Sequence, residues 1–196
     1  MPHPLMPPPE AFVRDRDADL GEEIVWPGKF ITAKQRGRWE YVGRPRNIRA
    51  AAIIAIDEDA DGTRHAILVS QYRVPLGRFC LEIPAGLVGD ISGAEDEGVL
   101  TAAARELEEE TGYRAGKLEV VGEFYSSPGM ISECFALLRA TALEKVAEGG
   151  GEGDENILVH RIPVDGIADF VTAWREAGHG VDVRVALFLT KDFLGE

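Results

Sequence analysis

The chain has 196 residues, which is long enough for one well-buried domain with an accessory element. Its formal net charge is −13 and its pI is about 4.8, and this acidity argues against nonspecific binding to nucleic acid or anionic membranes. Its two cysteines, Cys80 and Cys134, form no disulfide pattern, which is typical of a reducing cytosol. No apolar run approaches membrane-spanning length, and the proline-rich residues 1–10 lack a hydrophobic signal core, so we expect a cytoplasmic protein with a loosely attached N-terminal tail.

Residues 22–42 predict a small N-terminal β element. Apolar and polar side chains alternate along this segment, and Gly28 and Gly37 mark turns between two or three strands. We therefore expect two parts in the chain: residues 1–45, comprising the tail and this element, and residues 46–196, forming the main domain.

The main domain is predicted to mix strands and helices. The acidic turn at 57–62 has no glutamate at EF-hand spacing, so we interpret it as a solvated hairpin turn and not as a calcium loop. Mixed strands with helices on both sides favour an α/β/α sandwich. The expected strands are 48–57, 65–72, 81–84, 118–125, 133–140 and 157–163, and the expected helices are 95–111, 164–177 and 181–193.

The run Arg-Glu-Leu-Glu-Glu-Glu-Thr-Gly-Tyr at 105–113 predicts a metal-binding helix face. Glu106, Glu109 and Glu110 are spaced i, i+3 and i+4, so their carboxylates share one face, and Arg105 can pair with Glu109. Like charges this close repel each other, and a hard cation such as Mg²⁺ or Mn²⁺ would remove the repulsion. The alternative is a solvated acidic face. The opposite, core-facing side is expected to contain Leu100, Ala103, Ala104 and Leu107.

This run is part of a pattern that resembles the Nudix box, G-x5-E-x7-R-E-U-x-E-E-x-G-U, with U a bulky apolar residue. Glu97 stands at the required distance before Arg105, and residues 97–113 all fit. The expected glycine falls on Ile91, so its natural counterpart is Gly86, and the intervening loop is about five residues longer than usual. The resemblance implies a Nudix-type α/β/α sandwich with a mixed sheet.

The segments on either side of the box are similar to the ADP-ribose pyrophosphatase branch of the Nudix hydrolases. They are Gln-Tyr-Arg at 71–73, Leu-Glu-Ile-Pro-Ala-Gly at 81–86 and Tyr-Ser-Ser-Pro-Gly-Met-Ile-Ser-Glu at 125–133. The GDP-mannose hydrolases share much of this pattern, so it leaves the nucleobase open. The branch also implies a homodimer in which the N-terminal element often crosses to the partner.

The resemblance implies roles for residues of the box and of the glycine-rich acidic loop at 148–156. The loop would supply the catalytic base, with Glu155 the first choice and Glu152 the second, and we expect it to be mobile when empty and to close over substrate. Arg105 would orient the glutamates. The implied metal ligands are the Ala85 carbonyl, Glu106, Glu109, Glu110 and Glu155, and the implied catalytic residues are Glu109, Glu106, Glu155, Glu152 and Arg105.

Four further residues are candidates for substrate contacts, each with a plainer alternative. Glu82 would lie beside the diphosphate together with Arg73, or the two form only a structural ion pair. Trp39 would stack on the nucleobase or belong to a core. Arg49 would reach a phosphate or balance the acidic surface.

The sequence therefore predicts Mg²⁺-dependent hydrolysis of a nucleoside diphosphate sugar, with Mn²⁺ as a possible substitute. ADP-ribose, split into AMP and ribose 5-phosphate, is the expected substrate, and GDP-mannose or another such sugar is the alternative. A catalytically silent metal- or nucleotide-binding module is the alternative of another class, and the complete set of box glutamates argues against it.

Overall fold

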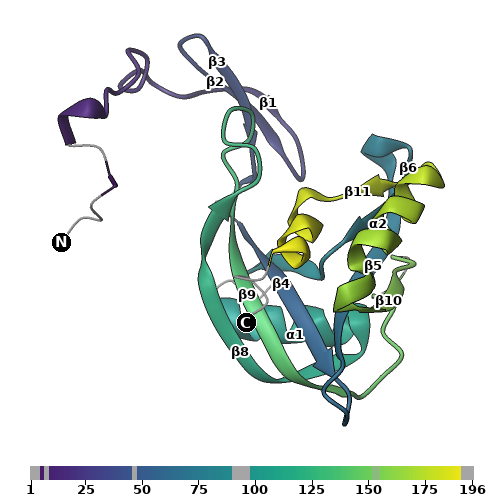
Figure 1. The fold of residues 1–196 in the computed structure, drawn as a ribbon. Coiled ribbons are helices and arrows are strands. Elements are labelled where there is room, and N and C mark those ends of the chain that lie inside the picture. Colours follow the sequence, from purple (N-terminus) through teal and green to yellow (C-terminus); the bar gives the residue numbers. More distant parts are fainter. Residues whose placement is uncertain are drawn as a thin grey trace. The chain divides into compact units, whose positions relative to one another are not determined.

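The computed structural model describes residues 5–6, 9–45, 48–89, 98–151, 153 and 155–190. The chain divides into two compact units (Figure 1). The first comprises residues 1–47 and 127–132, and the second comprises residues 48–126 and 133–196. No helix in the part of the chain described is both long and apolar enough to cross a membrane.

The first unit is built on a three-stranded antiparallel sheet in the order β1-β2-β3. Gly37 makes the turn between β2 and β3 with a φ of 57°, and a β-carbon there would lie 2.6 Å from Asp17 Cγ, so both conformation and space call for glycine. The turn at 127–132 packs on β3, since Val42 N–H donates to the Met130 carbonyl at 2.9 Å. The strands are β1 (Glu23–Pro27), β2 (Thr32–Arg36) and β3 (Trp39–Gly43), preceded by the 3-10 helix η1 (Pro9–Ala11).

The second unit contains a mixed eight-stranded sheet. Six strands lie in the order β11-β6-β5-β4-β9-β8, while β10 pairs with β5 and β7 pairs with β4. The β4–β9 and β11–β6 pairs are parallel and the others are antiparallel. The strands are β4 (Arg49–Glu58), β5 (Arg64–Arg73), β6 (Arg78–Glu82), β7 (Ala85–Val88), β8 (Tyr113–Tyr125), β9 (Cys134–Lys145), β10 (Leu158–Pro163) and β11 (Gly180–Val181).

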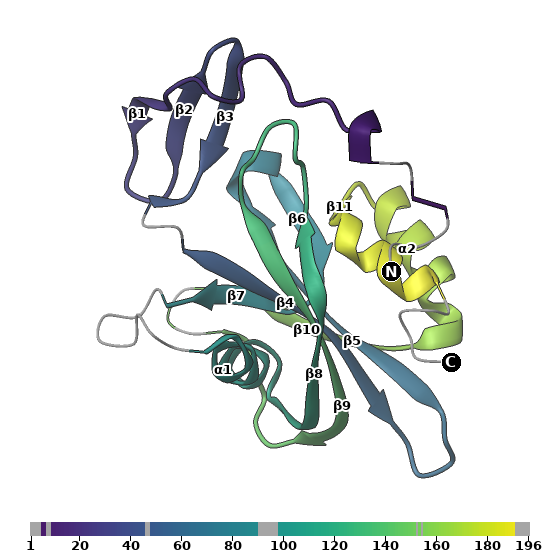
Figure 2. The ribbon, with the colours of Figure 1, turned by 90° about the vertical axis from the view of Figure 1, so that its left-hand side faces the viewer.

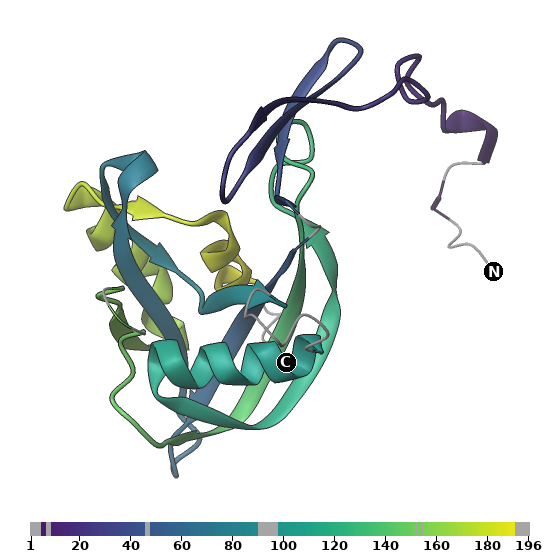
Figure 3. The ribbon, with the colours of Figure 1, turned by 180° about the vertical axis from the view of Figure 1, so that it is seen from behind.

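Helices cover both faces of this sheet, as Figures 2 and 3 show. Strand β4 explains the layering, because its side chains alternate between two buried clusters. Ile53 packs on one face with Leu107 of α1, and Ile54 packs on the other with Phe188 of η5. The predicted α/β/α sandwich is confirmed. The helices are α1 (Val99–Thr111) and α2 (Ile167–Glu176), with the 3-10 turns η3 (Val74–Leu76), η4 (Val164–Gly166) and η5 (Val183–Leu189).

Several predicted boundaries are wrong. Helix α1 begins at Val99 and not at residue 95, because Gly98 is extended, with a ψ of 147°. The last helix is a 3-10 helix rather than an α-helix, and β7 was not predicted. Leu100 and Ala104 are exposed, while Ala102 and Ala103 are buried with Leu107, so the core-facing stripe is rotated from the predicted one. Strand β8 begins at Tyr113, before its expected start at residue 118, and β9 continues to Lys145, beyond its expected end at residue 140.

Candidate active site

Helix α1 ends abruptly, and this ending places its glutamates. Gly112 adopts the left-handed conformation, with a φ of 69°, and its N–H donates to the Glu108 carbonyl at 2.8 Å. A β-carbon on Gly112 would lie 2.0 Å from the Ala147 carbonyl oxygen. The box glycine is therefore fixed both by its backbone conformation and by a neighbouring segment of backbone.

Arg105 joins two of the helix carboxylates. Its Nη1 donates to Glu109 Oε2 at 2.8 Å, which confirms the predicted i, i+4 pair, and its Nη2 lies 3.0 Å from Glu106 Oε1. All three side chains are only partly exposed, so solvent screens these ion pairs less than it would at the open surface. Arg105 thus holds Glu106 and Glu109 on the same side of the helix.

The other contacts of the helix face are with the segment that enters β7. The Ala85 N–H donates to Glu110 Oε2 at 3.1 Å, and the Glu106 carboxyl lies directly against Gly86. The start of β7 and the end of α1 therefore meet here, although they are widely separated in sequence. The Ala85 carbonyl and these carboxylates are predicted to bind the same metal ion, and the Ala85 backbone does lie beside them. Glu97 and the extended loop that precedes it lie outside the described residues.

The charge on Glu110 is poorly compensated. Burial, together with the carboxylates of Glu106, Glu155 and Glu82, raises the pKa of its carboxyl to about 8, although the Ala85 hydrogen bond lowers it. A buried acid among three other acids is a chemical environment that a hard cation would stabilise.

The donor set fits such a cation in chemistry, but it is not assembled as a finished metal site. Among the described side chains, no group of three or more acids, imidazoles or thiols is placed to hold a metal ion. The positive group that contacts Glu106 and Glu109 is the guanidinium of Arg105. A cation would therefore have to bind these two carboxylates alongside the guanidinium, which contacts one oxygen of each. Glu152, a further candidate, is outside the described part of the chain.

The segment at 146–151 is tied to the end of α1. Gly150 N–H donates to the Glu110 carbonyl at 2.8 Å, and Gly151 N–H donates to the Glu109 carbonyl at 3.1 Å. These bonds satisfy carbonyls at the helix end that have no partner within the helix. Lys145 Nζ adds bonds to the carbonyls of Thr111, at 2.9 Å, and Glu148, at 3.1 Å.

One glycine of this loop lies close to the end of α1. A β-carbon on Gly149 would lie 2.4 Å from the Thr111 carbonyl carbon. The glycine at this position permits close packing against the helix end. The same packing brings Glu155 near enough to Glu110 to raise the pKa of Glu110.

Arg73 and Glu82 form the ion pair that was one of the two predicted alternatives. Arg73 Nε and Nη2 donate to the two carboxylate oxygens of Glu82 at 2.6 and 2.7 Å. Glu82 is buried, whereas the Arg73 side chain is 43% exposed. The pair acts electrostatically on Glu110, so it belongs to the neighbourhood of the carboxylates. The pairing does not decide against a substrate role for Arg73.

Two candidate substrate residues lie elsewhere. Arg49, at the start of β4, is exposed and pairs with Glu123 at 2.9 Å. Trp39 belongs to the first unit, where it is 44% exposed and is not a core residue.

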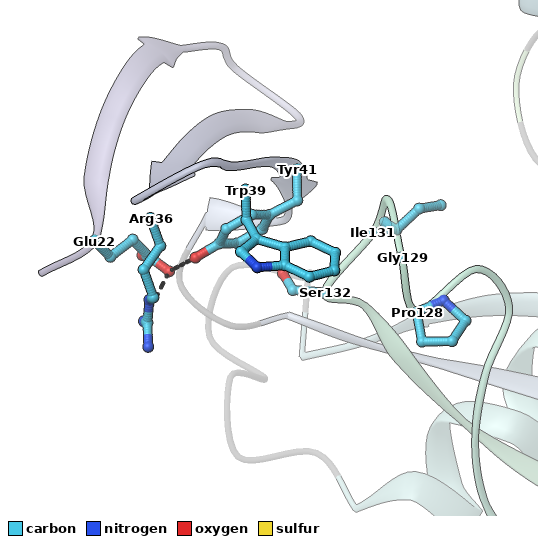
Figure 4. A pocket seen from close by; sticks show the side chains of 8 residues that line it. All are labelled: Glu22, Arg36, Trp39, Tyr41, Pro128, Gly129, Ile131 and Ser132. Atoms are coloured by element: carbon cyan, nitrogen blue, oxygen red, sulfur yellow. Dashed lines mark hydrogen bonds and ion pairs between the residues drawn. The ribbon is translucent and has the colours of Figure 1, made fainter. Parts of the chain in front are cut away.

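Trp39 lines a pocket of about 380 Å³ within the first unit (Figure 4). Tyr41 and Arg36 both reach Glu22, whose Oε2 accepts a 2.6 Å hydrogen bond from the Tyr41 hydroxyl and lies 3.6 Å from Arg36 Nη2. The hydrogen bonds from Tyr41 and Lys34 hold the pKa of Glu22 below its usual value, so this acid is ionised at neutral pH. The lining residues are Glu22, Arg36, Trp39, Tyr41, Pro128, Gly129, Ile131 and Ser132.

Sequence reasoning missed Lys145, Asp182 and Arg184. Lys145 lies 34 residues from the helix carbonyl that it contacts, and no local pattern marks it. Asp182 and Arg184 follow the short strand β11 and extend the Arg73–Glu82 pair. The Asp-x-Arg spacing was the only available signal, and it is common in surface segments.

Comparisons with known proteins agree with this geometry. Residues 46–174 match the NUDIX domain. An uncharacterized Nudix hydrolase of Schizosaccharomyces pombe is 31% identical over 159 residues, covering 76% of this chain and 75% of that protein. An ADP-ribose pyrophosphatase of Bacillus subtilis is 40% identical over 115 residues, covering 59% of this chain and 57% of that enzyme, which is less than two thirds of its length. The crystal structure of an ADP compounds hydrolase matches with a TM-score of 0.63 and 24% identity, over 90% of this chain and 93% of that one, which shows a shared fold.

Proposed function

The chain belongs to the Nudix hydrolase family, and on that premise we propose that it hydrolyses the diphosphate bond of a nucleoside diphosphate sugar, with ADP-ribose as substrate and AMP and ribose 5-phosphate as products. The observation that carries the proposal is the meeting of Glu106 and Glu110 with the Ala85–Gly86 backbone, which places both carboxylates against the same short segment. The name of the 40% identical Bacillus subtilis enzyme supports ADP-ribose as the substrate.

The proposed cofactor is Mg²⁺, with Mn²⁺ as a substitute. The ligands would be the Ala85 carbonyl and the carboxylates of Glu106, Glu109, Glu110 and Glu155, all of which offer the oxygen atoms that these cations prefer. When bound, the cation supplies neutralisation of the diphosphate and activation of the attacking water. The raised pKa of Glu110 supports this assignment, because burial and the neighbouring acids disfavour its ionised form, which a bound cation would stabilise.

The protein groups would position substrate and move a proton. Arg105, which contacts both Glu106 and Glu109, orients these carboxylates. Glu155 would accept the proton of the attacking water, with Glu152 as the alternative base. Arg73 would offer its exposed guanidinium to the diphosphate while Glu82 fixes its orientation. Arg49 would reach a phosphate by releasing Glu123.

We also propose that the pocket of the first unit receives the nucleobase. The exposed Trp39 ring offers a stacking surface, and the ionised Glu22 offers an acceptor for an exocyclic amino group such as that of adenine. Substituting Trp39 by Leu would be expected to raise KM with little change in kcat, because base binding contributes equally to the ground state and the transition state.

We further propose a cytoplasmic homodimer in which residues 1–45 form a separate element that contributes to the interface, attached to a hydrolase domain at 46–196. Exposed apolar side chains on β1 support this view, among them Ile24, Val25 and Trp26. Light scattering of the full chain and of a variant with Val25 replaced by Asp would test it. A monomeric wild-type chain would refute it.

The decisive experiment is a hydrolysis screen of nucleotide sugars with Mg²⁺ and with Mn²⁺, in which the products are identified by mass. The expected result is a higher kcat/KM for ADP-ribose than for GDP-mannose, with free nucleoside triphosphates poor substrates. Preference for GDP-mannose would keep the metal chemistry and change the substrate. Binding of nucleotides without turnover of any compound would indicate a silent module.

A further inference from the structure

Four alternating charges form one network in the second unit. Arg73 binds Glu82 through two hydrogen bonds of 2.6 and 2.7 Å. Arg184 Nη2 lies 3.9 Å from Glu82 Oε2, the oxygen that also accepts from Arg73 Nη2. Arg184 in turn binds Asp182, with Nε–Oδ1 at 2.7 Å and Nη2–Oδ2 at 3.0 Å. The buried carboxylate of Glu82 is therefore shared by two guanidinium groups.

Arg184 is held firmly in this position. Asp182 begins η5 by accepting from the Arg184 N–H at 2.8 Å, and the Asp182 N–H donates to the Leu81 carbonyl at 2.8 Å. Strand β11 pairs in parallel with β6, the strand that ends at Glu82. The guanidinium also lies over the Phe135 ring, 5.5 Å from its centroid. The backbone at 182–184 is thus fixed to the strand that presents Glu82.

The network has a consequence for an anionic ligand. Its four formal charges, two positive and two negative, sum to zero. The side chain of Glu82 is 5% exposed and that of Arg184 is 18% exposed, so water screens their charges weakly. Without Arg184 the sum of the formal charges would be −1. Within this network, the negative charge of the buried Glu82 carboxylate would then be compensated by Arg73 alone.

We propose that Arg184 is a positioning residue of the substrate site, which shares the neutralisation of Glu82 with Arg73 and so leaves the exposed part of the Arg73 guanidinium available for the diphosphate. The inference rests on the proposed function, since it assumes a substrate with a diphosphate. Arg184 itself does not touch the reacting atoms. Its effect is on binding of the anion, and the chemical step depends on the carboxylates of α1.

The test compares Arg184→Gln, Arg184→Lys and Asp182→Asn with the wild-type protein. One added negative charge near an anionic substrate should raise KM for ADP-ribose about tenfold in Arg184→Gln, with kcat within about twofold of wild type. Arg184→Lys restores the charge and should recover most of the lost affinity. Asp182→Asn makes the network positive, so KM should fall below the wild-type value.

The opposite signs separate an electrostatic role from a structural one. If Arg184 only stabilises the fold, Arg184→Gln and Asp182→Asn will both lower the melting temperature and leave KM of the folded protein unchanged, and this result would overturn the inference. Arg161→Gln is the matched control, because Arg161 pairs with Asp57 and Asp59 on another hairpin, and it should leave KM unchanged.

Direct binding distinguishes failure of this inference from failure of the proposed function. The Kd for ADP-ribose is measured by calorimetry in EDTA, where no turnover is expected. A wild-type protein that binds but hydrolyses no nucleotide sugar would refute the proposed function, and the ratio of Kd values between Arg184→Gln and wild type would still test the role of Arg184. Equal Kd values in the two proteins would refute that role, and a wild-type protein that neither binds ADP-ribose in EDTA nor hydrolyses it with Mg²⁺ would refute both.

Discussion

The Cα atom of Gly86 lies against the carboxyl group of Glu106, so closely that a β-carbon on residue 86 would be 1.9 Å from Glu106 Cδ. This contact gives a physical reason for glycine at this position, since any side chain would occupy the place of the carboxylate. The atoms in the way are the end of a flexible side chain, so a substitution would displace the carboxylate and leave the backbone in place. Gly86 therefore controls where Glu106 can be.

Substituting Gly86 by Ala should reduce activity without unfolding the protein. Displacement of a metal-binding carboxylate by about 1 Å is expected to lower kcat on the order of 10²-fold. Steady-state kinetics and thermal unfolding would measure the two effects. Gly98→Ala is the control, because Gly98 has open space around its Cα and an ordinary φ of −70°. Wild-type kcat in Gly86→Ala would contradict the proposed role of Glu106.

Replacing Glu109 by Gln should lower kcat on the order of 10²-fold or more, because it removes a preorganised charge from the site. The fold should be retained, since volume hardly changes and repulsion among the glutamates falls. Glu108→Gln is the matched control on the same helix, since Glu108 pairs with Arg114 and is not among the proposed ligands. Activity of the wild-type protein should also vanish in EDTA and return with Mg²⁺ or Mn²⁺. Equal kcat values for the two variants would remove Glu109 from the site.

Gly149→Ala should destabilise the protein by about 1–3 kcal/mol, because it combines an unfavourable φ of 76° with a clash against the backbone of Thr111. Gly153→Ala shares the positive φ, but its β-carbon would meet no atom of the described residues within 4 Å, so its cost should be smaller. Urea unfolding of both variants gives the comparison. Equal losses of stability would show that close packing at the end of α1 adds nothing to the requirement for glycine.

The identity of the base can be decided by Glu155→Gln and Glu152→Gln made in parallel. A base acts in the chemical step, so Glu155→Gln is expected to lower kcat more than it changes KM, and Glu152→Gln should be milder. The reverse ranking would assign the role to Glu152. Wild-type turnover in both single variants and in the double variant, across the pH range, would exclude the loop as the source of the base.

The lowered pKa of His160 predicts that the folded protein loses stability in acid. Burial lowers the pKa of its imidazole from the usual 6.5, so the unfolded chain takes up the proton more readily than the folded one. Its neutral form favours folding above pH 6.5, and this contribution is lost as pH falls through that value toward the folded pKa. Urea unfolding between pH 7.5 and 5 should show a shallower decline for His160→Gln than for wild type. Parallel declines would exclude His160 as the cause.

The sequence by itself determined those features that depend on neighbours along the chain. The i, i+4 pair of Arg105 and Glu109 follows from helical spacing, and the alternation along β4 follows from the period of a strand with both faces buried. The box pattern predicted the fold and the acidic face of α1. Local periodicity was less reliable at the ends of elements, as the start of α1 at Val99 shows, because capping and packing decide where a helix begins.

Tertiary structure alone decided which distant groups meet. The contact of Glu106 with Gly86, the bond from Lys145 to Thr111 and the approach of Arg184 to Glu82 join segments that only strand register and helix packing bring together. The same packing makes glycine at position 149 a condition for close approach to the end of α1. A pattern of residue types cannot encode these relationships, because the cost of burying a charge depends on what surrounds it in space, and not on what precedes it in the chain.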